Sequence, residues 1–394
     1  MILEQIPYYL GFNSLTKLSP RKARLLLEYF QQDVEAAWHG QEQWREALGE
    51  KNEKRLQEIL AQRQQADPAG LYQNFLACGC GLCILGDPDY PELLSHIYDP
   101  PVLLFYYGVL PEPEDICIAM IGSRDFTTYG RQVAGIFSRD LATQGITVVS
   151  GMARGIDSIC HEGAIHAGGR TLAVLGSGLD VVYPRGNSSL YQQICQQGAV
   201  ISEFPLGMPA LRGNFPQRNR IISGLCQAVL VVEASEKSGT MLTVGYALDQ
   251  GRDVFAVPGP VTSPNSRGTN RLIRDGARMA LSAEDIYSEY GNVSLWQKEE
   301  PLPKRALSAA APAKEEPPQK ADARGELLPG LSQTERILLR RLLTPVQLDE
   351  LAMDPELADD AAHLAATLTM LEIRGLVKQL PGKYYQAVVK NIYR

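Results

Sequence analysis

The spacing of apolar residues differs between regions of the chain, and these differences divide the chain into candidate domains. Over residues 1–68 apolar residues recur at helical spacing, as in "SPRKARLLLEYFQQ" (19–32). In that stretch Ser19 and Pro20 suit the residue before a helix and its first position. A second helical stretch covers residues 41–66, beginning "QEQWREALGE". These patterns predict a small helical domain over 1–68.

Over residues 69–290, helical stretches alternate with short apolar, β-branched runs, most of which end at glycine. The runs are "DICIAMIG" (115–122), "ITVVSG" (146–151), "RTLAVLGSG" (170–178), "AVISEF" (199–204), "AVLVVEA" (228–234) and "DVFAVPG" (253–259). This alternation indicates an α/β domain whose mostly parallel sheet is covered by helices on both faces. Such sheets bind ligands where their strands end, so the loops after these runs are the first candidates for a site.

The rest of the chain predicts a linker and a second small domain. Residues 291–326 are rich in Pro, Ala and charge without apolar periodicity, which is typical of a disordered linker. In residues 327–394, Ser332 and Glu335 have the spacing of a helix capping box. Three helical stretches there precede a hairpin pattern, "LVKQLPGKYYQAVV" (376–389). This is the winged-helix order, and whether the domain binds DNA or protein stays open.

Charge and cysteine content narrow the class of protein. The net charge of −7 excludes a uniformly basic nucleic-acid binder. However, residues 204–232 and 254–274 each contain three arginines and no Asp or Glu, so a local basic surface remains possible. The seven cysteines, an odd number, do not indicate a disulfide framework. Without a secretory signal pattern or a run of about 18 apolar residues, we expect a cytoplasmic protein with no membrane partner.

The loop "IGSRDFTTYG" (121–130) joins a predicted strand to a predicted helix and carries the first candidate site. The N–H groups of a helix start attract anions, and Gly122 allows close approach. Ser123 and Thr127 add hydroxyl donors. Arg124 adds a fork of donors that suits phosphate oxygens. The spacing is neither a dinucleotide-binding nor a P-loop pattern, and a plain turn with an exposed arginine is the alternative interpretation.

Three further loops repeat the combination of glycine and hydroxyl groups: "SGMARGID" (150–157), "GSGLDVVYP" (176–184) and "KSGTMLT" (237–243). The ends of parallel strands meet at one sheet edge, so we expect all four loops to converge there, three of them with a cation. Since one phosphate needs one such loop, several indicate a run of phosphates or a nucleotide. The candidate residues in these loops are Ser150, Gly151, Arg154, Lys237, Ser238, Gly239 and Thr240.

The stretch "FPQRNR" (215–220) adds Arg218, Asn219 and Arg220 beside Phe215. Two arginines near an aromatic ring suit a single nucleic-acid strand, because they neutralise its backbone while the ring stacks on a base. The alternative is that Phe215 belongs to the core and that Asn219 caps a helix.

No catalytic or metal-binding set stands out in the sequence. Cys160 and His161 are neighbours, and neighbouring helical positions point apart, so they do not form a nucleophile–base pair. We expect His161 to be packed. Cys78, Cys80 and Cys83 lack a matching Cys/His pair, which argues against a zinc site. We therefore expect no enzyme activity, no metal and no cofactor.

In their order and spacing over about 90–285, the quoted stretches resemble the DNA-processing protein DprA (Smf) family. The resemblance implies an extended Rossmann-like fold between a SAM-like helical domain and a winged-helix domain. It also implies a non-catalytic homodimer that binds and protects single-stranded DNA. Such a protein displaces single-strand-binding protein and loads the RecA recombinase during natural transformation and recombination. The residues to which it assigns DNA or phosphate contact are Ser123, Arg124, Thr127, Ser150, Gly151, Arg154, Phe215, Arg218, Asn219, Arg220, Lys237, Ser238, Gly239 and Thr240, with Gly122 beside them.

Two other functions suit this fold. Phosphoribohydrolases of similar fold cleave nucleoside monophosphates with a glutamate that follows a Gly-Thr pair. Aligning Gly239 and Thr240 with that pair places Thr243 at the glutamate position, where a hydroxyl cannot supply the charge that the reaction needs. A nucleotide-sensing module is the second alternative, and a basic path long enough for several nucleotides argues against it.

Overall fold

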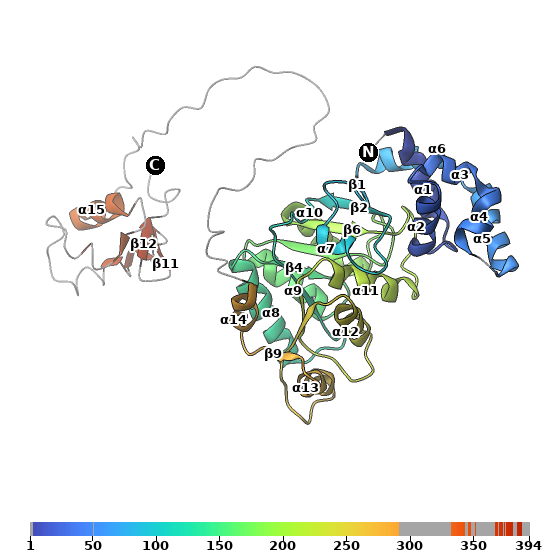
Figure 1. Ribbon diagram of the computed structural model, residues 1–394. Coiled ribbons are helices and arrows are strands. Elements are labelled where there is room, and N and C mark those ends of the chain that lie inside the picture. The colour runs from blue at the N-terminus through green and yellow to red at the C-terminus, as the bar shows by residue number, and fades with distance from the viewer. Residues whose placement is uncertain are drawn as a thin grey trace, which may run out of the picture. The chain divides into compact units, whose positions relative to one another are not determined.

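The computed structural model describes residues 3–49 and 51–290 and, near the C-terminus, residues 332–342, 346–347, 351, 367–368, 370–372, 374, 376–380 and 384–387. The chain divides into two compact units, Met1–Leu302 and Pro303–Arg394, and each is described by itself (Figure 1). The predicted linker 291–326 lies outside the described residues. None of the described helices combines the length and apolar character that a membrane crossing needs.

The first unit contains a helical N-terminal part followed by a sheet with helices on both faces (Figure 1). Its strands are β1 (Gly81–Ile84), β2 (Leu103–Gly108), β3 (Cys117–Ile121), β4 (Thr147–Ser150), β5 (Thr171–Val174), β6 (Ala199–Ser202), β7 (Ala228–Val231), β8 (Asp253–Ala256) and β9 (Arg278–Met279). Its helices are α1 (Ile6–Ser14), α2 (Pro20–Tyr29), α3 (Val34–His39), α4 (Trp44–Leu48), α5 (Glu53–Gln65), α6 (Pro68–Cys78), α7 (Glu92–Ser95), α8 (Thr128–Thr143), α9 (Ile156–His166), α10 (Ser188–Gln197), α11 (Asn214–Gly224), α12 (Thr240–Asp249), α13 (Arg267–Arg274) and α14 (Glu284–Tyr287).

The strands of this unit form one sheet in the order β1-β2-β6-β5-β4-β3-β7-β8-β9. Neighbours from β6 to β9 are parallel, whereas β2 pairs antiparallel with both β6 and β1. The predicted mostly parallel, Rossmann-like α/β fold is therefore confirmed, and the antiparallel pair β1–β2 and the short edge strand β9 add to the six strands predicted. The chain moves outward from β3 to β6 and then returns to the other side of β3 with β7. Ligands of open α/β sheets bind at such a reversal.

The sheet is buried on both faces, which explains why its strands are apolar at consecutive positions. On one face Ile121 and Val231 pack with Ile221 of α11 and Val244 of α12. The opposite face packs against α8, α9 and α14, and Phe137 and Phe255 are buried there. The alternation of core contacts along each strand fixes the register, in which Ile118 to Ile121 pair with Ala228 to Val231.

The N-terminal helices pack around Phe12, Trp38 and Trp44. The predicted start of α2 is confirmed, because the Ser19 side chain accepts a hydrogen bond from the backbone N–H of Lys22 at 3.4 Å. The stretch 41–66 was predicted as one helical stretch, but it forms α4 and α5. The break lies at Gly49, whose φ of 54° is left-handed and ends α4.

In the second unit, α15 (Gln333–Arg341) begins with the predicted capping box. The Ser332 hydroxyl accepts a hydrogen bond from the N–H of Glu335 at 3.2 Å, and the Glu335 carboxylate accepts one from the N–H of Ser332 at 2.7 Å. Strands β11 (Val377–Leu380) and β12 (Tyr384–Ala387) pair as the predicted hairpin, and β10 (Val346–Gln347) joins β12. Most of the other two predicted helices lies outside the described residues, so the winged-helix assignment and the bounds of the four predicted segments stay predictions.

Candidate nucleic-acid interface

A crevice of about 710 Å³ lies where the strand order reverses, between the loops that follow β3 and β7. Helix α11 and the loop after β4 complete its walls. Of the predicted residues, the crevice brings together Gly122, Ser123, Arg124, Phe215, Arg218, Asn219, Ser238, Gly239 and Thr240. The predicted residues that do not line it are Thr127, Ser150, Gly151, Arg154, Arg220 and Lys237. Whether any of them contacts DNA stays a prediction.

The loop after β3 is held by its own hydrogen bonds and by the end of β7. The N–H of Ser123 donates to the carbonyl oxygen of Glu233 at 2.8 Å. The Ser123 hydroxyl accepts from the N–H of Asp125 at 3.1 Å and donates to the Asp125 carbonyl at 3.0 Å. Arg124, between them, is exposed. A Cβ on Gly122 would lie 2.7 Å from Ile156 of α9, so this glycine is required by helix packing more than by a ligand.

The start of α8 is occupied by a carboxylate of the protein itself. The hydroxyl of Thr127 donates to Glu233 at 2.6 Å, and the N–H of Thr127 donates to the other carboxylate oxygen at 2.9 Å. The same hydroxyl accepts from the N–H of Gly130 at 3.1 Å. We predicted that this helix start would attract an anion from solution. In the structure Glu233, only 1% exposed, takes that place.

The second predicted loop, which follows β4, packs beneath the residues that line the crevice. The Ser150 hydroxyl donates to the carbonyl oxygen of Met120 at 2.6 Å and is buried. The guanidinium of Arg218 donates to the carbonyl oxygens of Gly151, at 2.7 Å, and Val174. Arg218 is 3% exposed, and burial lowers its pKa to about 10. Arg218 therefore forms part of the floor and leaves little of its surface for a phosphate.

Arg220 is turned away from the crevice. Its guanidinium donates to both carboxylate oxygens of Glu203, at 2.7 and 2.6 Å, and to the carbonyl oxygen of Asp99 at 2.9 Å. Arg220 and Glu203 are 6% and 7% exposed. Whether Arg220 contacts DNA stays a prediction, but it does not lie beside Arg218 in the crevice. The reason is that positions two apart on a helix point to opposite sides.

Aromatic and guanidinium groups meet at the open side of the crevice. The guanidinium carbon of Arg124 lies 5.5 Å from the centre of the Phe215 ring, and that of Arg218 lies 5.9 Å from it. The Tyr183 ring centre lies 5.7 Å from that of Phe215, with 49° between the ring planes. Tyr183 is 50% exposed. This arrangement offers ring faces and a free cation side by side.

Sequence reasoning missed Tyr183 and Arg212, which also line the crevice. Both lay in stretches that had been singled out. Tyr183 ends the third glycine-rich loop, and Arg212 belongs to the segment 204–232, which has no acidic residue. The glycine-rich loop and the segment without acidic residues were each a signal in the sequence. Neither residue, however, lies at a predicted helix start or in a motif that would distinguish it from its neighbours.

The loop after β7 closes the crevice with Ser238, Gly239 and Thr240. The Ser238 hydroxyl is buried and has no hydrogen-bond partner within the described part of the chain. The Thr240 hydroxyl donates to the carbonyl oxygen of Gly122 at 3.3 Å, so the loops after β3 and β7 are in contact. A Cβ built on Gly239 meets no atom within 4 Å, which places this backbone against open space. Lys237 is exposed but does not line the crevice.

Comparison with known proteins gives the family. The model of the family "DNA recombination-mediator protein A" matches residues 81–291. Protein Smf of Synechocystis sp. is 35% identical over 394 residues, covering 96% of this chain and 98% of that protein. This chain belongs to the DNA recombination-mediator protein A family. The resemblance to DprA and Smf inferred from the sequence is confirmed.

Further DprA/Smf relatives agree with this assignment. The DNA processing protein DprA of Streptococcus pneumoniae is 42% identical over 204 residues, which are 52% of this chain and 72% of that protein. Its X-ray structure superposes with a TM-score of 0.64 at 35% identity, covering 73% of this chain and 98% of that one. The family model's match over residues 81–291 includes the crevice.

No histidine or cysteine is among the described residues that line the crevice. His161 is buried, its Nδ1 lies 2.7 Å from the Thr171 hydroxyl, and burial lowers its pKa to about 3. The predicted packing of His161 is confirmed. Cys160 packs in the core beside α8, and burial raises its pKa well above the usual value. Among the residues that the structure describes, no three His, Cys, Asp or Glu side chains are grouped to hold a metal ion.

Proposed function

We propose that the crevice binds single-stranded DNA and holds it without cutting it. The observation that carries the proposal is the exposed Arg124 guanidinium over the ring of Phe215, with the Tyr183 ring centre 5.7 Å from that of Phe215. Cations neutralise the phosphates of a strand, and aromatic faces stack on its bases. Arg212 adds a second exposed cation at the same opening.

The arrangement favours a single strand over a duplex. Stacking on Phe215 or Tyr183 requires a base whose face is free, and paired bases are stacked on one another. The exposed backbone at Gly239 lines the same space, and backbone contacts to phosphates carry no sequence information. We therefore propose binding that depends on salt and tolerates any sequence.

The carboxylates in the crevice do not suit hydrolysis of DNA. Only Asp125 and Asp157 line it. Asp157 is buried, accepts from the N–H of Ala153 at 3.3 Å, and burial raises its pKa. Thr243 stands where a phosphoribohydrolase needs a glutamate and is itself 2% exposed. These features support a holding role, in which phosphate contacts position the strand.

The family supports a wider role, which we also propose. In this role the protein acts in the cytoplasm, protects incoming DNA, displaces single-strand-binding protein and loads the RecA recombinase during natural transformation and recombination. We propose a homodimer as the working form. Strand β9 at the sheet edge, with exposed Met279 (49%) and Leu281 (68%), is a candidate contact surface, because apolar side chains beside an open edge favour association.

The test is a titration of labelled oligonucleotides of increasing length, single- and double-stranded, at two salt concentrations. We expect single strands to bind more tightly, with affinity that rises with length and falls with salt. Equal affinity for duplex and single strand, or indifference to salt, contradicts the proposal. Release of free base from nucleoside monophosphates, assayed in parallel, would show a phosphoribohydrolase instead.

A further inference from the structure

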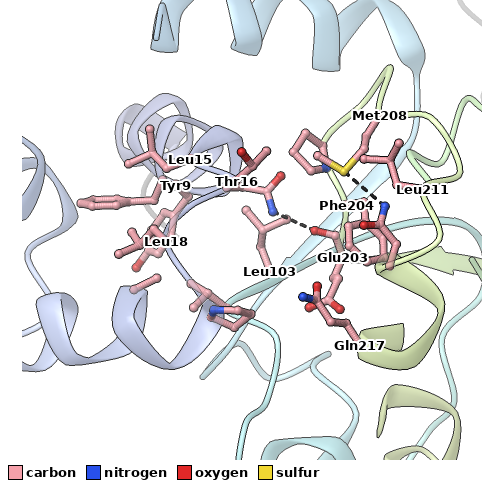
Figure 2. A pocket seen from close by; sticks show the side chains of 17 residues that line it. Tyr9, Leu15, Thr16, Leu18, Leu103, Glu203, Phe204, Met208, Leu211 and Gln217 are labelled. Carbon is pink, nitrogen blue, oxygen red and sulfur yellow. Dashed lines mark hydrogen bonds between the residues drawn. The ribbon is translucent and has the colours of Figure 1, made fainter. Parts of the chain in front are cut away.

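A second cavity, of about 300 Å³, lies between the N-terminal helices and the sheet (Figure 2). Leu15 and Leu18, from the loop between α1 and α2, form one wall. Phe204, Met208 and Leu211, from the loop after β6, form the facing wall, as Figure 2 shows. The cavity is therefore built by two parts of the chain that are far apart in sequence, and it is mainly apolar.

The cavity is open to solution along one rim. Thr16, Leu211 and Gln217 line it and are exposed, with Leu211 at 51%. Leu211 lies opposite Thr16 across the cavity in Figure 2. A ligand can therefore enter without separation of the N-terminal helices from the sheet.

The polar side chains that line the cavity are amides, the hydroxyl groups of Tyr9 and Thr16, and one carboxylate that is paired with a guanidinium. The Asn13 side chain donates to the carbonyl oxygen of Glu203 at 2.8 Å, which leaves its own amide oxygen as an acceptor. The Gln217 side chain has no hydrogen-bond partner within the described ranges. The Glu203 carboxylate is paired with Arg220. Apolar walls with a few amide groups suit an uncharged, planar molecule that carries N–H and C=O groups at its edge.

The cavity and the crevice share the start of α11 as a common wall. Leu211 lines the cavity and its neighbour Arg212 lines the crevice. One turn further on, Gln217 faces the cavity while Phe215 faces the crevice. A polyanion that crosses this helix start passes an exposed arginine, and the segment 204–232 has no acidic residue to repel it.

We propose that this cavity takes one nucleobase of the strand held in the crevice. The inference rests on the proposed function and extends it. The strand would cross the start of α11 with a phosphate near Arg212, and a base beyond it would enter between Leu18 and Leu211. The N-terminal helices thereby become part of the DNA site.

The first test locates the base directly in the unmodified protein. A thymidine oligonucleotide that spans both sites carries one 4-thiothymidine, moved along the strand, and crosslinked peptides are identified by mass spectrometry. We expect one position to crosslink near Phe215 and another, a few nucleotides away, to crosslink to residues 9–23 or 203–211. Absence of any crosslink to those two segments overturns the inference.

The second test measures the energy. A single abasic position is moved along the same strand, and we expect the position in the cavity to weaken binding about 5- to 150-fold, as for one stacked base. Thr16→Trp and Leu211→Trp place a ring at the rim and should abolish that penalty while leaving the one at Phe215. Leu76→Trp is the control, since Leu76 is 52% exposed on α6 and does not line the cavity.

The outcomes separate the two proposals. If the tryptophan variants keep the wild-type abasic profile, the cavity holds no base and this inference fails. If they bind DNA normally but lose contact with a recombinase, the cavity serves a protein partner and the inference also fails. If the wild-type protein binds no single strand at all, the proposed function itself is wrong. Thermal melting of each variant verifies that it is folded.

Discussion

The guanidinium carbon of Arg124 lies 5.5 Å from the centre of the Phe215 ring. The two residues are far apart in sequence: Arg124 lies in the loop after β3, and Phe215 lies in α11. Arg124 is exposed, and Phe215 is half-buried. The pair therefore presents a positive charge and an apolar face to the same ligand, because neither side chain is fully buried.

Replacing Arg124 with alanine should weaken binding of single-stranded DNA by about 10- to 100-fold, since one charge-assisted contact is lost. It should also reduce the slope of log affinity against log salt by about 0.7, the value for one phosphate of a single strand. Fluorescence anisotropy at several salt concentrations measures both. Arg139→Ala, an exposed arginine near the end of α8, is the control. An unchanged slope in R124A would remove Arg124 from the site.

Gly239→Leu should block the crevice without unfolding the protein. A Cβ at this position meets no atom within 4 Å, and Gly239 itself lines the crevice. Gly245→Leu in α12 is the control, because a Cβ on Gly245 also meets no atom within 4 Å and Gly245 does not line the crevice. We expect equal melting temperatures for the two variants and loss of DNA binding in G239L alone. Normal DNA binding by G239L would place the strand elsewhere.

Arg220→Met should act on stability. It leaves the Glu203 carboxylate buried and unpaired, which costs about 3–5 kcal/mol. Chemical denaturation of the variant measures this loss. The double variant Arg220→Met, Glu203→Leu removes both charges and should recover much of it. If R220M were as stable as the wild type and bound DNA poorly, Arg220 would be a ligand after all.

His161 should make stability depend on pH. The Thr171 hydroxyl donates to the Val148 carbonyl, so it accepts from Nδ1–H of His161, and Nε2 is left buried without a partner. The pKa of His161 falls from 6.5 to about 3 in the folded protein. Between these values the unfolded chain binds the extra proton, so the contribution of His161 to stability is complete above pH 6.5 and is lost as pH falls toward 3.

The measurement compares denaturation of the wild type and His161→Gln at pH 7 and pH 5. Both proteins share every other titrating group, including Asp157, whose raised pKa acts in the opposite direction. We expect the wild type to lose more stability than H161Q over this interval. Equal losses in the two proteins would show that His161 is not the group responsible.

The sheet was predictable from the sequence because its strands are continuously apolar, and apolar runs that end at glycine can be recognised locally. The meeting of the loops after β3 and β7 followed from the rule that parallel strands end at one edge. The pair β1–β2 was missed because it is antiparallel and lies outside the strand–helix alternation.

The roles of individual polar residues were harder to predict, since they depend on distant partners. Thr127 looked available for an anion, but Glu233, 106 positions later, occupies it. Arg218 and Arg220 looked equivalent, yet one supports the floor of the crevice and the other pairs with Glu203. The only sequence feature that could have distinguished their roles is that they are two positions apart on one helix, so that their side chains point to different sides. Arg124 and Phe215 were predicted and do face the crevice.

Glu233 joins the two halves of the sheet at the point where they diverge. Its carbonyl oxygen is bound to Ser123 and its carboxylate to Thr127, so the end of β7 is fastened to the loop after β3. These hydrogen bonds keep the loops after β3 and β7 at one distance from each other, whether or not a ligand lies in the crevice. The width of the crevice then selects ligands by size, so that a polymer enters according to its thickness and before any of its bases is recognised.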